Sequence, residues 1–340
     1  MHSNHVARRR FSLAVAGCLL AGRVLAQSDY DPDWSQHFRI GAIGGFNIKT
    51  TFRLQGNLNT GHGPGVFDDG YVHPPPAGTA DSYTPNWGYN NASQVSGQTL
   101  TMTDTTSFTL NNGASEQKDA GPLAGFEMAY GGNLWYWNRF RFGWDAGVGI
   151  LPINVTVNES GLPGFSAQNT YTYNTGGIQM PPAGYRGGNG GQWNIDSQAT
   201  STNSATPAGL LSGSQTLDVI LYTARLGPTV YWDMNSYVGF SASLGPAIGV
   251  VNGKLKWNET ITTVSTGGTA QMTGQVNGTD VVYGGYVNAQ VYWHVVKNGD
   301  LYLGAQFMPL TTATISGGGH QAELNFRGQV SVSGGFNWPF

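Results

Sequence analysis

Charged side chains are scarce in this sequence: Asp, Glu, Lys and Arg make up 10% of it, against about 25% in soluble proteins. Cysteine is scarcer still, because the chain contains only Cys18. A single cysteine excludes a fold held together by its own disulfides. Long apolar runs are also lacking. The N-terminal run Phe11–Gly22 is too short for a transmembrane helix, which needs about 20 apolar residues.

Residues 1–26 have the pattern of a secretory signal peptide. Arg8–Arg10 form a positive start, Phe11–Gly22 form the apolar run, and Val24–Ala26 offer a small-residue cleavage site. Two alternatives stay open for this segment. Val15–Cys18 resembles a lipoprotein box, although the residues after its cysteine are apolar where a mature lipoprotein usually turns polar. The arginines also resemble a twin-arginine signal, although that route carries folded proteins.

Cleavage after Ala26 would change the charge balance of the chain. It would remove four of the 16 basic residues and none of the 19 acidic ones, leaving 12 against 19, or −7. An acidic chain with few cations argues against nucleic-acid binding, which needs a basic face. Cys18 would leave with the signal peptide, so the mature chain would have no thiol chemistry.

Glycine and aromatic residues, by contrast, are abundant. The chain has 51 glycines in 340 residues, about double the usual share of roughly 7%. It also has 10 Trp, 16 Tyr and 15 Phe, which together make 41 aromatic residues and argue against disorder in the segments that contain them. This composition favours a glycine-rich β architecture over a helical enzyme.

The last twenty residues, Gln321–Phe340, alternate between apolar or small and polar side chains. Successive side chains of a strand point to opposite faces, so this segment predicts a strand with one apolar and one polar face. It is much longer than the usual strand of about five or six residues. A barrel strand that crosses a membrane needs about 9–11 residues, with apolar side chains facing lipid. The apolar set includes Ala322, Leu324, Phe326, Val330, Val332, Phe336, Trp338 and Phe340.

Seven further segments alternate in the same way and predict seven more strands. These segments are approximately 36–54, 121–134, 139–157, 217–232, 237–257, 280–296 and 301–315. The strands are joined alternately by short turns and by other, mostly longer connections. The short turns lie near 137–138, 233–236 and 297–300, and the other connections are 55–119, 158–216, 258–279 and 316–320. Outer-membrane barrels have short periplasmic turns and long external loops, so both ends of the mature chain are expected in the periplasm. The weaker alternation at Thr99–Leu110 is assigned to a strand within a loop, since a ninth membrane strand would break this parity.

These patterns resemble those of bacterial outer-membrane β-barrel proteins, and in particular the small eight-stranded OmpA type. The resemblance rests on the terminal residues Phe336, Trp338 and Phe340, on the signal peptide and on the rhythm of the strands. It implies an all-β, closed antiparallel up-and-down transmembrane barrel of eight strands with long extracellular loops. It also implies an outer-membrane location in contact with lipid, and recognition of the C-terminal strand by the barrel-insertion machinery.

Two groups of residues are expected to have defined places in such a barrel. Aromatic residues that flank the short turns would form a girdle at the periplasmic boundary of the membrane; its tryptophans are Trp137, Trp232, Trp293 and Trp338. Charged residues at inward positions must pair, because an isolated buried ion is very costly. The predicted interior network consists of Arg39, Glu127, Arg141, Asp145, Arg225, Glu323 and Arg327.

Three classes of function are compatible with these features. The first, which the sequence favours, is a structural or surface-interaction protein whose loops 55–119 and 158–216 meet an extracellular partner. The second is a small passive diffusion pore. The third is a membrane-embedded lipid-modifying enzyme, for which the loop histidines His62, His73 and His320 and the nearby Asp68 and Asp69 are the candidates. These histidines share no ligand spacing and no serine lies in a nucleophile motif, so no catalytic, cofactor or metal residue is predicted.

Overall fold

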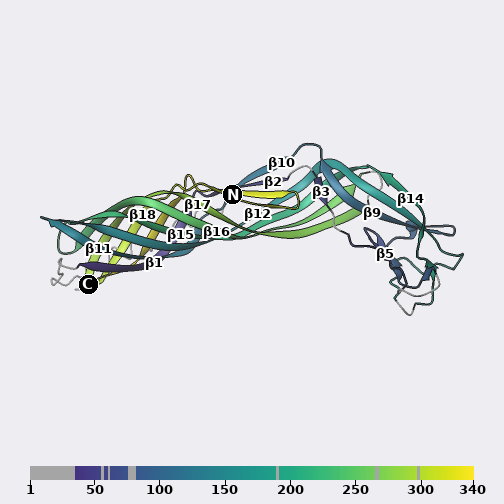
Figure 1. The fold of residues 1–340 in the computed structure, drawn as a ribbon, viewed down its shortest axis with the longest axis horizontal. Helices are drawn as coiled ribbons and strands as arrows, with labels where there is room; N and C mark the ends of the chain where they lie inside the picture. Colours follow the sequence, from purple (N-terminus) through teal and green to yellow (C-terminus); the bar gives the residue numbers. More distant parts are fainter. Residues whose placement is uncertain are drawn as a thin grey trace, which may run out of the picture.

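The computed structural model describes residues 35–54, 57–59, 62–75, 82–188, 191–264, 268–296 and 299–340. The predicted signal peptide and Cys18 lie outside these ranges. The described chain is almost entirely β-strand and forms an elongated molecule, with its C-terminus at one end and β14 (Ala199–Ala205) near the other (Figure 1). Among the described residues, no helix is long and apolar enough to cross a membrane.

Eight antiparallel strands pair in a ring. In order of pairing they are β11 (Leu123–Trp137), β1 (Gln36–Phe46), β21 (Val330–Pro339), β18 (Gly299–Phe307), β17 (Thr269–Val296), β16 (Val238–Thr263), β15 (Ala208–Asp233) and β12 (Phe140–Asn174). Because β12 also pairs with β11, the order returns to its starting strand. These eight strands overlap the eight segments that alternation predicts, so the all-β class and the antiparallel ring of eight are confirmed.

The short connections of the ring lie at one end of the molecule. Asn138 has a positive φ of 55° and begins the turn between β11 and β12, where the sequence predicts a tight turn. The start of β1 and the end of β21 lie at the same end, because the backbone amides of Gln36 and Phe340 each donate to the carbonyl oxygen of the other, at 2.9 and 2.8 Å. This arrangement matches the predicted parity of short turns and long connections.

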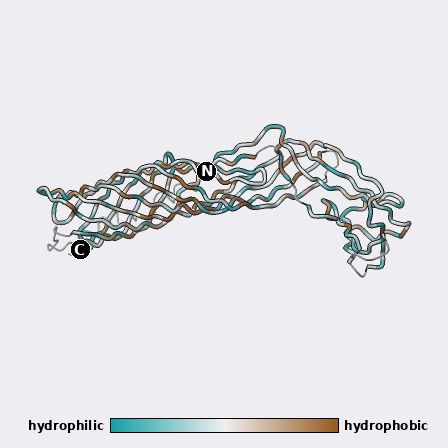
Figure 2. Tube along the Cα trace, in the orientation of Figure 1, coloured by the Kyte–Doolittle hydropathy of each residue, from teal (hydrophilic) through white to brown (hydrophobic). Residues whose placement is uncertain are grey.

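The inner and outer faces of the ring strands exchange character part-way along the molecule, as β12 illustrates. Near the turns, the inward positions of β12 hold charged or small residues, namely Arg141, Gly143, Asp145, Gly147 and Gly149. From Leu151 onward the inward residues are apolar, namely Leu151, Ile153, Val155 and Val157. The outward residues change in the opposite sense, from Phe142, Trp144, Ala146, Val148 and Ile150 to Asn154, Thr156 and Asn158. Figure 2 shows the alternation of apolar and polar residues along these strands.

This inversion of polarity occurs at the same height in neighbouring strands. Leu151 of β12 pairs with Leu221 of β15, which pairs with Val251 of β16, and all three are the first large apolar residues to face inward. In β17, Val282 is buried two residues from the position that pairs with Val251. A single boundary therefore divides the ring into a part with a polar interior and apolar exterior and a part with the reverse.

Beyond this boundary the long strands form one layer of a two-layer structure, which we call the extension. The second layer is a sheet of four strands in the order β10 (Ala114–Asp119), β2 (Lys49–Leu54), β20 (His320–Asn325) and β19 (Thr312–Gly317). An apolar core joins the layers, with Phe52 and Leu324 from the four-stranded sheet packed in one cluster with Ile153, Leu217 and Val251 from the long strands. Burial of such side chains contributes about 1.5–3 kcal/mol each, so the extension is a folded unit.

The prediction of loops at 55–119 and 158–216 is therefore wrong over much of their length. β12 continues to Asn174, β15 begins at Ala208, and the two pair as far as Phe165 and Ala208. Thr99–Leu110 forms β9, which pairs with β12 outside the ring, as its assignment to the loop requires. The outward residues of these strands are Asn, Thr, Ser and Gly because that face meets solvent, and such residues resemble a loop in the sequence.

Two breaks in the strands also depart from prediction. Asn47, with φ of 59°, separates β1 from β2, and residues 326–329 separate β20 from β21. Each break shifts the alternation: even-numbered residues such as Phe38 and Ile40 face outward in β1, whereas Phe52 and Leu54 of β2 point into the core of the extension. The predicted continuous strands 36–54 and 321–340 are each two strands in different sheets.

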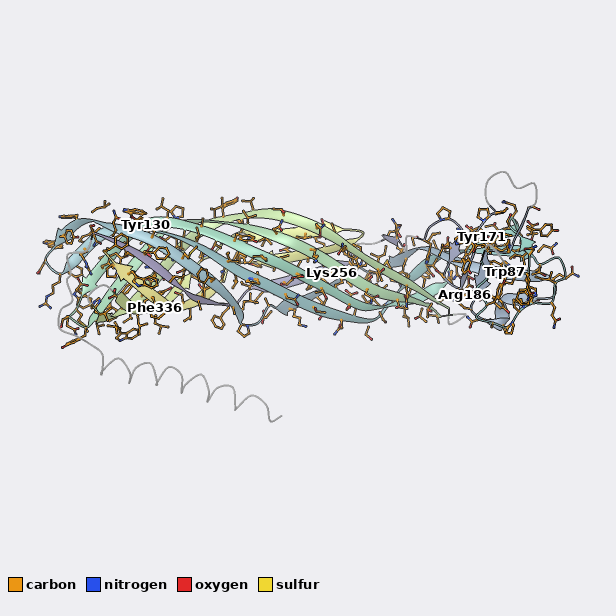
Figure 3. All side chains as sticks on the ribbon, turned by 90° about the horizontal axis from the view of Figure 1, so that it is seen from below. Trp87, Tyr130, Tyr171, Arg186, Lys256 and Phe336 are labelled. Carbon is orange, nitrogen blue, oxygen red and sulfur yellow. The ribbon has the colours of Figure 1, made fainter. Side chains whose placement is uncertain are left out.

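The far end of the molecule is a distal tip, formed by the described residues 62–75, 82–104, 171–188 and 191–199. Its small elements are β4 (Val66–Phe67), β5 (Gly70–Val72), β6 (Tyr83–Thr84), β7 (Trp87–Tyr89), β8 (Val95–Ser96), β13 (Ile195–Asp196) and the short 3-10 helix η1 (Ala92–Gln94); β3 (Asn57–Asn59) lies below it on β9. The tip has its own core, which includes Trp87, Met102 and Ile195. Figure 3 shows Trp87, Tyr171 and Arg186 at this end, opposite Tyr130 and Phe336.

Candidate functional site

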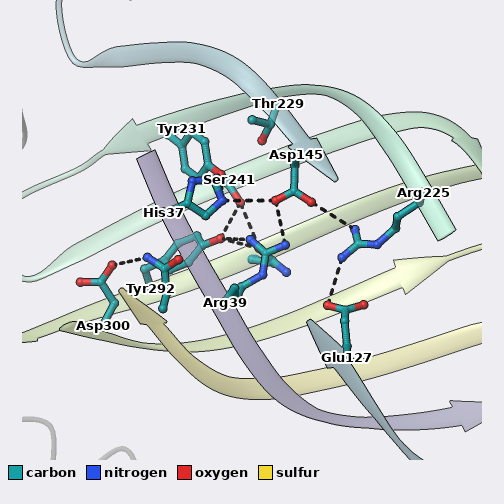
Figure 4. Close-up of polar contacts among 12 residues, drawn as sticks. His37, Arg39, Glu127, Asp145, Arg225, Thr229, Tyr231, Ser241, Tyr292 and Asp300 are labelled. Carbon is teal, nitrogen blue, oxygen red and sulfur yellow. Dashed lines mark hydrogen bonds and ion pairs between the residues drawn. The ribbon is translucent and has the colours of Figure 1, made fainter. Parts of the chain in front are cut away.

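A buried polar cluster fills the ring between the turns and the boundary of polarity (Figure 4). Asp145 lies at its centre. Arg39 donates from Nη2 to Asp145 Oδ2 at 2.8 Å, and His37 Nε2 lies 3.3 Å from the same oxygen. Arg225 Nη1 lies 3.8 Å from the other oxygen, Asp145 Oδ1. Asp145 and Arg39 are each about 1% exposed, so both charges are removed from solvent and depend on each other.

Arg225 connects this centre to the neighbouring carboxylate. Its Nη2 lies 3.0 Å from Glu127 Oε1, and its guanidinium lies over the ring of Tyr286, 5.1 Å from the centroid. Gly147 makes room for this side chain, since a Cβ there would stand 2.7 Å from Arg225 Nε. An eight-stranded ring is narrow, so small residues at inward positions allow arginines to extend across it.

Tyrosines and glutamine complete the cluster on the side of the turns. Arg39 donates from Nη1 to the Tyr292 hydroxyl at 2.9 Å, and Ser241 Oγ donates to the same oxygen at 3.3 Å. The Tyr292 hydroxyl in turn donates to Gln290 Oε1. Tyr231 places its hydroxyl 2.9 Å from His37 Nε2. These contacts link β1, β15, β16 and β17 across the interior.

A third group of ion pairs lies next to the turns. Arg141 donates from Nη2 to Asp233 Oδ1 at 2.5 Å. His294 Nδ1 lies 2.8 Å from Asp300 Oδ1, and Asn337 donates from Nδ2 to Asp300 Oδ2 at 2.8 Å. Each acidic side chain in this group thus has a named partner on another strand, and the polar filling continues to the turn end of the ring.

The structure places five of the seven residues of the predicted network inside the ring: Arg39, Glu127, Arg141, Asp145 and Arg225. The prediction is wrong for Glu323 and Arg327. Glu323 lies on the outer side of β20, where it pairs with Arg53 at 3.2 Å, and Arg327 is exposed between β20 and β21. Their strand segment belongs to the extension, whose inner face is apolar, so the polar residues of that segment face outward.

The sequence prediction did not include several residues of the cluster. His37 lies two residues before Arg39 and therefore shares its inward face, and Asp233 shares the parity of Tyr231 in the same strand. Asp300 pairs in register with His294, a buried inward residue of β17. Parity therefore places all three on the inward face, although Asp233 and Asp300 also lie within the predicted short turns 233–236 and 297–300.

The predicted girdle tryptophans lie on the outer face of the ring at its turn end. Trp137, Trp232 and Trp338 are 65%, 41% and 43% exposed, and Trp293 is half-buried. They stand among other aromatics, as in the stacked pair of Phe140 and Trp232, with ring centroids 6.1 Å apart. Phe336 and Phe340, of the predicted insertion signal, are exposed at the same end.

A separate polar cluster lies inside the extension. His320 Nε2 stands 3.0 Å from Glu259 Oε1, neither side chain is accessible to solvent, and the indole of Trp257 stacks on the imidazole at 4.2 Å. Gln215 donates to the nearby Glu159 at 2.6 Å. Burial, together with the negative charge of Glu259, raises the pKa of Glu159 to about 7. His320 is therefore a core residue and not the loop histidine that the sequence suggested.

The remaining enzyme candidates lie in the distal tip. His62 and Asp68 approach each other there, with Nδ1 and Oδ1 3.5 Å apart, while Asp69 accepts a hydrogen bond from the backbone amide of Thr103. His73 instead stacks on Tyr71, with centroids 5.2 Å apart. His62, His73 and His320 therefore do not form one site.

Comparisons with known proteins give matches among solved structures alone. No protein-family model matches the chain, and no curated protein matches it. The chain is similar to the outer membrane protease OmpT from Escherichia coli, with 11% identity and a TM-score of 0.32, over 92% of this chain and 98% of that chain. It is similar to the outer membrane protein OprG from Pseudomonas aeruginosa, with 8% identity and a TM-score of 0.32, over the same shares.

A third similar structure is Ail, the attachment invasion locus protein of Yersinia pestis, with 9% identity and a TM-score of 0.23, over 88% of this chain and 99% of that chain. OmpT is an outer membrane protease and OprG an outer membrane protein.

Proposed function

We propose that this protein is an integral outer-membrane β-barrel that holds a folded extension and distal tip at the cell surface, where the tip contacts an extracellular partner. The observation that carries the proposal is the inversion of polarity at Leu151, Leu221 and Val251. An apolar exterior over a polar interior suits a ring surrounded by lipid, and the reverse suits a structure surrounded by water.

The height of the apolar exterior supports this assignment. On the outer face of β12 it runs from Phe140 to Pro152. Twelve residue steps of about 3.3 Å cover about 40 Å along the strand, or about 30 Å of height at a tilt of about 40°. The hydrocarbon core of a bilayer is also about 30 Å thick. The girdle tryptophans at the turn end would then lie at the periplasmic boundary, as interfacial aromatics do.

The interior supports a structural or surface-interaction role over a pore. The cluster around Asp145 crosses the ring, and directly above it the inward residues are the packed apolar side chains that include Leu151 and Leu221. An ion passing through the ring would have to cross both the charged cluster and the packed apolar side chains. The tip, in turn, has a separate aromatic core at the greatest distance from the proposed membrane, which gives the proposed contact surface a defined shape.

In a planar bilayer, the purified mature protein is expected to show no steady conductance, because the charged cluster and the apolar core fill the ring. The variants Glu127→Ala and Arg225→Ala are each expected to stay closed, since either substitution leaves the apolar core in place. A porin inserted into the same bilayer serves as the positive control. Stable open channels of the unaltered protein would contradict the proposal and favour the passive pore.

Labelling of single cysteines on intact cells tests which part faces outward. The only native cysteine, Cys18, lies in the predicted signal peptide. Tyr83→Cys, at a tip position that is 50% exposed, is expected to react fully with a membrane-impermeant maleimide. Met234→Cys, in the turn between β15 and β16 and 40% exposed, is expected to react only after the outer membrane is permeabilised. The reverse pattern would overturn the proposed orientation.

A further inference from the structure

Three side chains of the distal tip bring their ligand atoms together. They are His62, which precedes β4, Asp68, in the turn between β4 and β5, and Asp104, on β9. His62 Nδ1 lies 3.1 Å from Asp104 Oδ1 and 3.5 Å from Asp68 Oδ1, and one ligand atom of each residue lies within 4.8 Å of those of the other two. We propose that these residues form a binding site for a divalent transition-metal cation such as Zn²⁺.

The spacing of the three atoms suits such an ion. Zinc binds nitrogen and oxygen ligands at about 2.0–2.2 Å in a tetrahedron, which holds the ligand atoms about 3.3–3.5 Å apart. The two distances from His62 Nδ1, 3.1 and 3.5 Å, are close to this separation. One imidazole and two carboxylates favour a transition metal over Ca²⁺ or Mg²⁺, which prefer oxygen ligands alone.

Asp68 supplies an independent reason to expect a ligand. Its side chain is 7% exposed, and its Oδ1 makes no hydrogen bond to any other described residue although it points towards His62. A buried carboxylate oxygen without a donor is costly. The other oxygen, Oδ2, is held by the amide of Thr105 at 2.9 Å and by its hydroxyl at 2.6 Å. Such contacts orient a metal-binding carboxylate and are typical around metal sites.

Charge also favours a cation at this place. Among the described residues, His62 is the only basic side chain within ion-pair distance of Asp68 or Asp104. A divalent ion bound by a neutral imidazole would balance both carboxylates. It would join the small sheet of β4, β5 and β7 to β9, which continues into the extension, and so fix the orientation of the tip. The site goes beyond the proposed surface role and does not depend on it.

The test is a calorimetric titration of untagged, EDTA-treated, full-length protein in detergent with ZnCl₂, and with CaCl₂ in parallel. We expect one equivalent of Zn²⁺ to bind and Ca²⁺ to bind at least tenfold more weakly. His62→Gln and Asp104→Asn are each expected to weaken Zn²⁺ binding at least tenfold. His73→Gln is the matched control, because His73 lies in the same tip but faces Tyr71, and its binding should equal that of the unaltered protein.

Co²⁺ absorption gives a second measurement that does not depend on heat of binding. A tetrahedral site with one imidazole should give intense visible bands in the unaltered protein and in His73→Gln, and lose them in His62→Gln. Circular dichroism of each variant should match the unaltered protein, which separates loss of ligand from loss of fold. Absence of Zn²⁺ binding, or equal binding by His62→Gln and Asp104→Asn, would overturn the proposal and leave the three residues as an ion-paired cluster.

Discussion

Replacing Asp145 with alanine is expected to lower the free energy of unfolding by about 3–5 kcal/mol, because it leaves a buried charge without its partner. Arg225 would keep Glu127 at 3.0 Å, but Arg39 would keep no carboxylate partner and would be left with the Tyr292 hydroxyl at 2.9 Å and the ring of Tyr302. The loss of stability should therefore come mainly from the buried Arg39 guanidinium, whose charge would no longer be paired with a carboxylate. Urea unfolding in detergent, followed by tryptophan fluorescence and by heat-modifiable migration on gels, measures it.

Two comparisons make this expectation specific. Asp218→Ala breaks an exposed pair with Lys256, in which the atoms are 3.9 Å apart and the side chains are 47% and 44% exposed; this should cost less than about 1 kcal/mol. The double variant Arg39→Met with Asp145→Leu removes both charges and should lose less stability than Asp145→Ala alone. If Asp145→Ala and Asp218→Ala lost equal stability, the cluster would not hold the ring together.

An arginine at Val148 is expected to destabilise the protein in a bilayer by about 2–4 kcal/mol, the cost of a cation on the lipid face near the midplane. Val148 is 51% exposed on the outer face of β12, below the boundary at Leu151. The matched control is Asn154→Arg, on the same face of the same strand but beyond the boundary, where the cost should be close to zero. Both substitutions place the same charge on an outward position only six residues apart.

Refolding into lipid vesicles and unfolding by guanidinium chloride would measure this difference. The loss of stability in Val148→Arg should require lipid around the ring, because an arginine at an outward position that meets water costs little. An equal cost for the two arginines would place the membrane boundary elsewhere and would contradict the proposal that the inversion of polarity marks it.

The strands of the ring were predictable from the sequence because they depend on a local pattern, the alternation of side chains along each strand. Alternation in β12, β15 and β16 follows from the geometry of a single strand, and the short turns appear in the sequence as breaks between alternating segments. Paired charges such as Arg39 and Asp145 could be expected inside because a buried charge needs a partner. The pairing of individual charges could not be predicted. Arg141, for example, pairs with Asp233, which lies in the predicted short turn 233–236.

The extension was not predictable from the same rule. Residues of β12 beyond Asn158, such as Thr170 and Asn174, resemble a loop because their strand turns a polar face to water. Its few apolar side chains, such as Leu162 and Tyr173, become recognisable as core residues only when the clusters that they pack against, around Phe108 and in the tip, are seen. The metal ligands of the tip come from segments about 40 residues apart, 62–68 and 104, and no local spacing connects them.

The sequence by itself determined which residues share a face within each uninterrupted strand, how many strands form the ring, and where its short turns lie, because these depend on a repeat of two along the chain. Only the tertiary structure decided which of the two faces points inward in the extension, where a second layer covers the apolar face. Breaks such as the one at Asn47 shift the alternation by one residue, and the environment of the outer face changes from apolar to polar at Leu151. Glu323 and Arg327 were misplaced for that reason: a strand has two faces, and the neighbours that cover one of them are not adjacent in the chain.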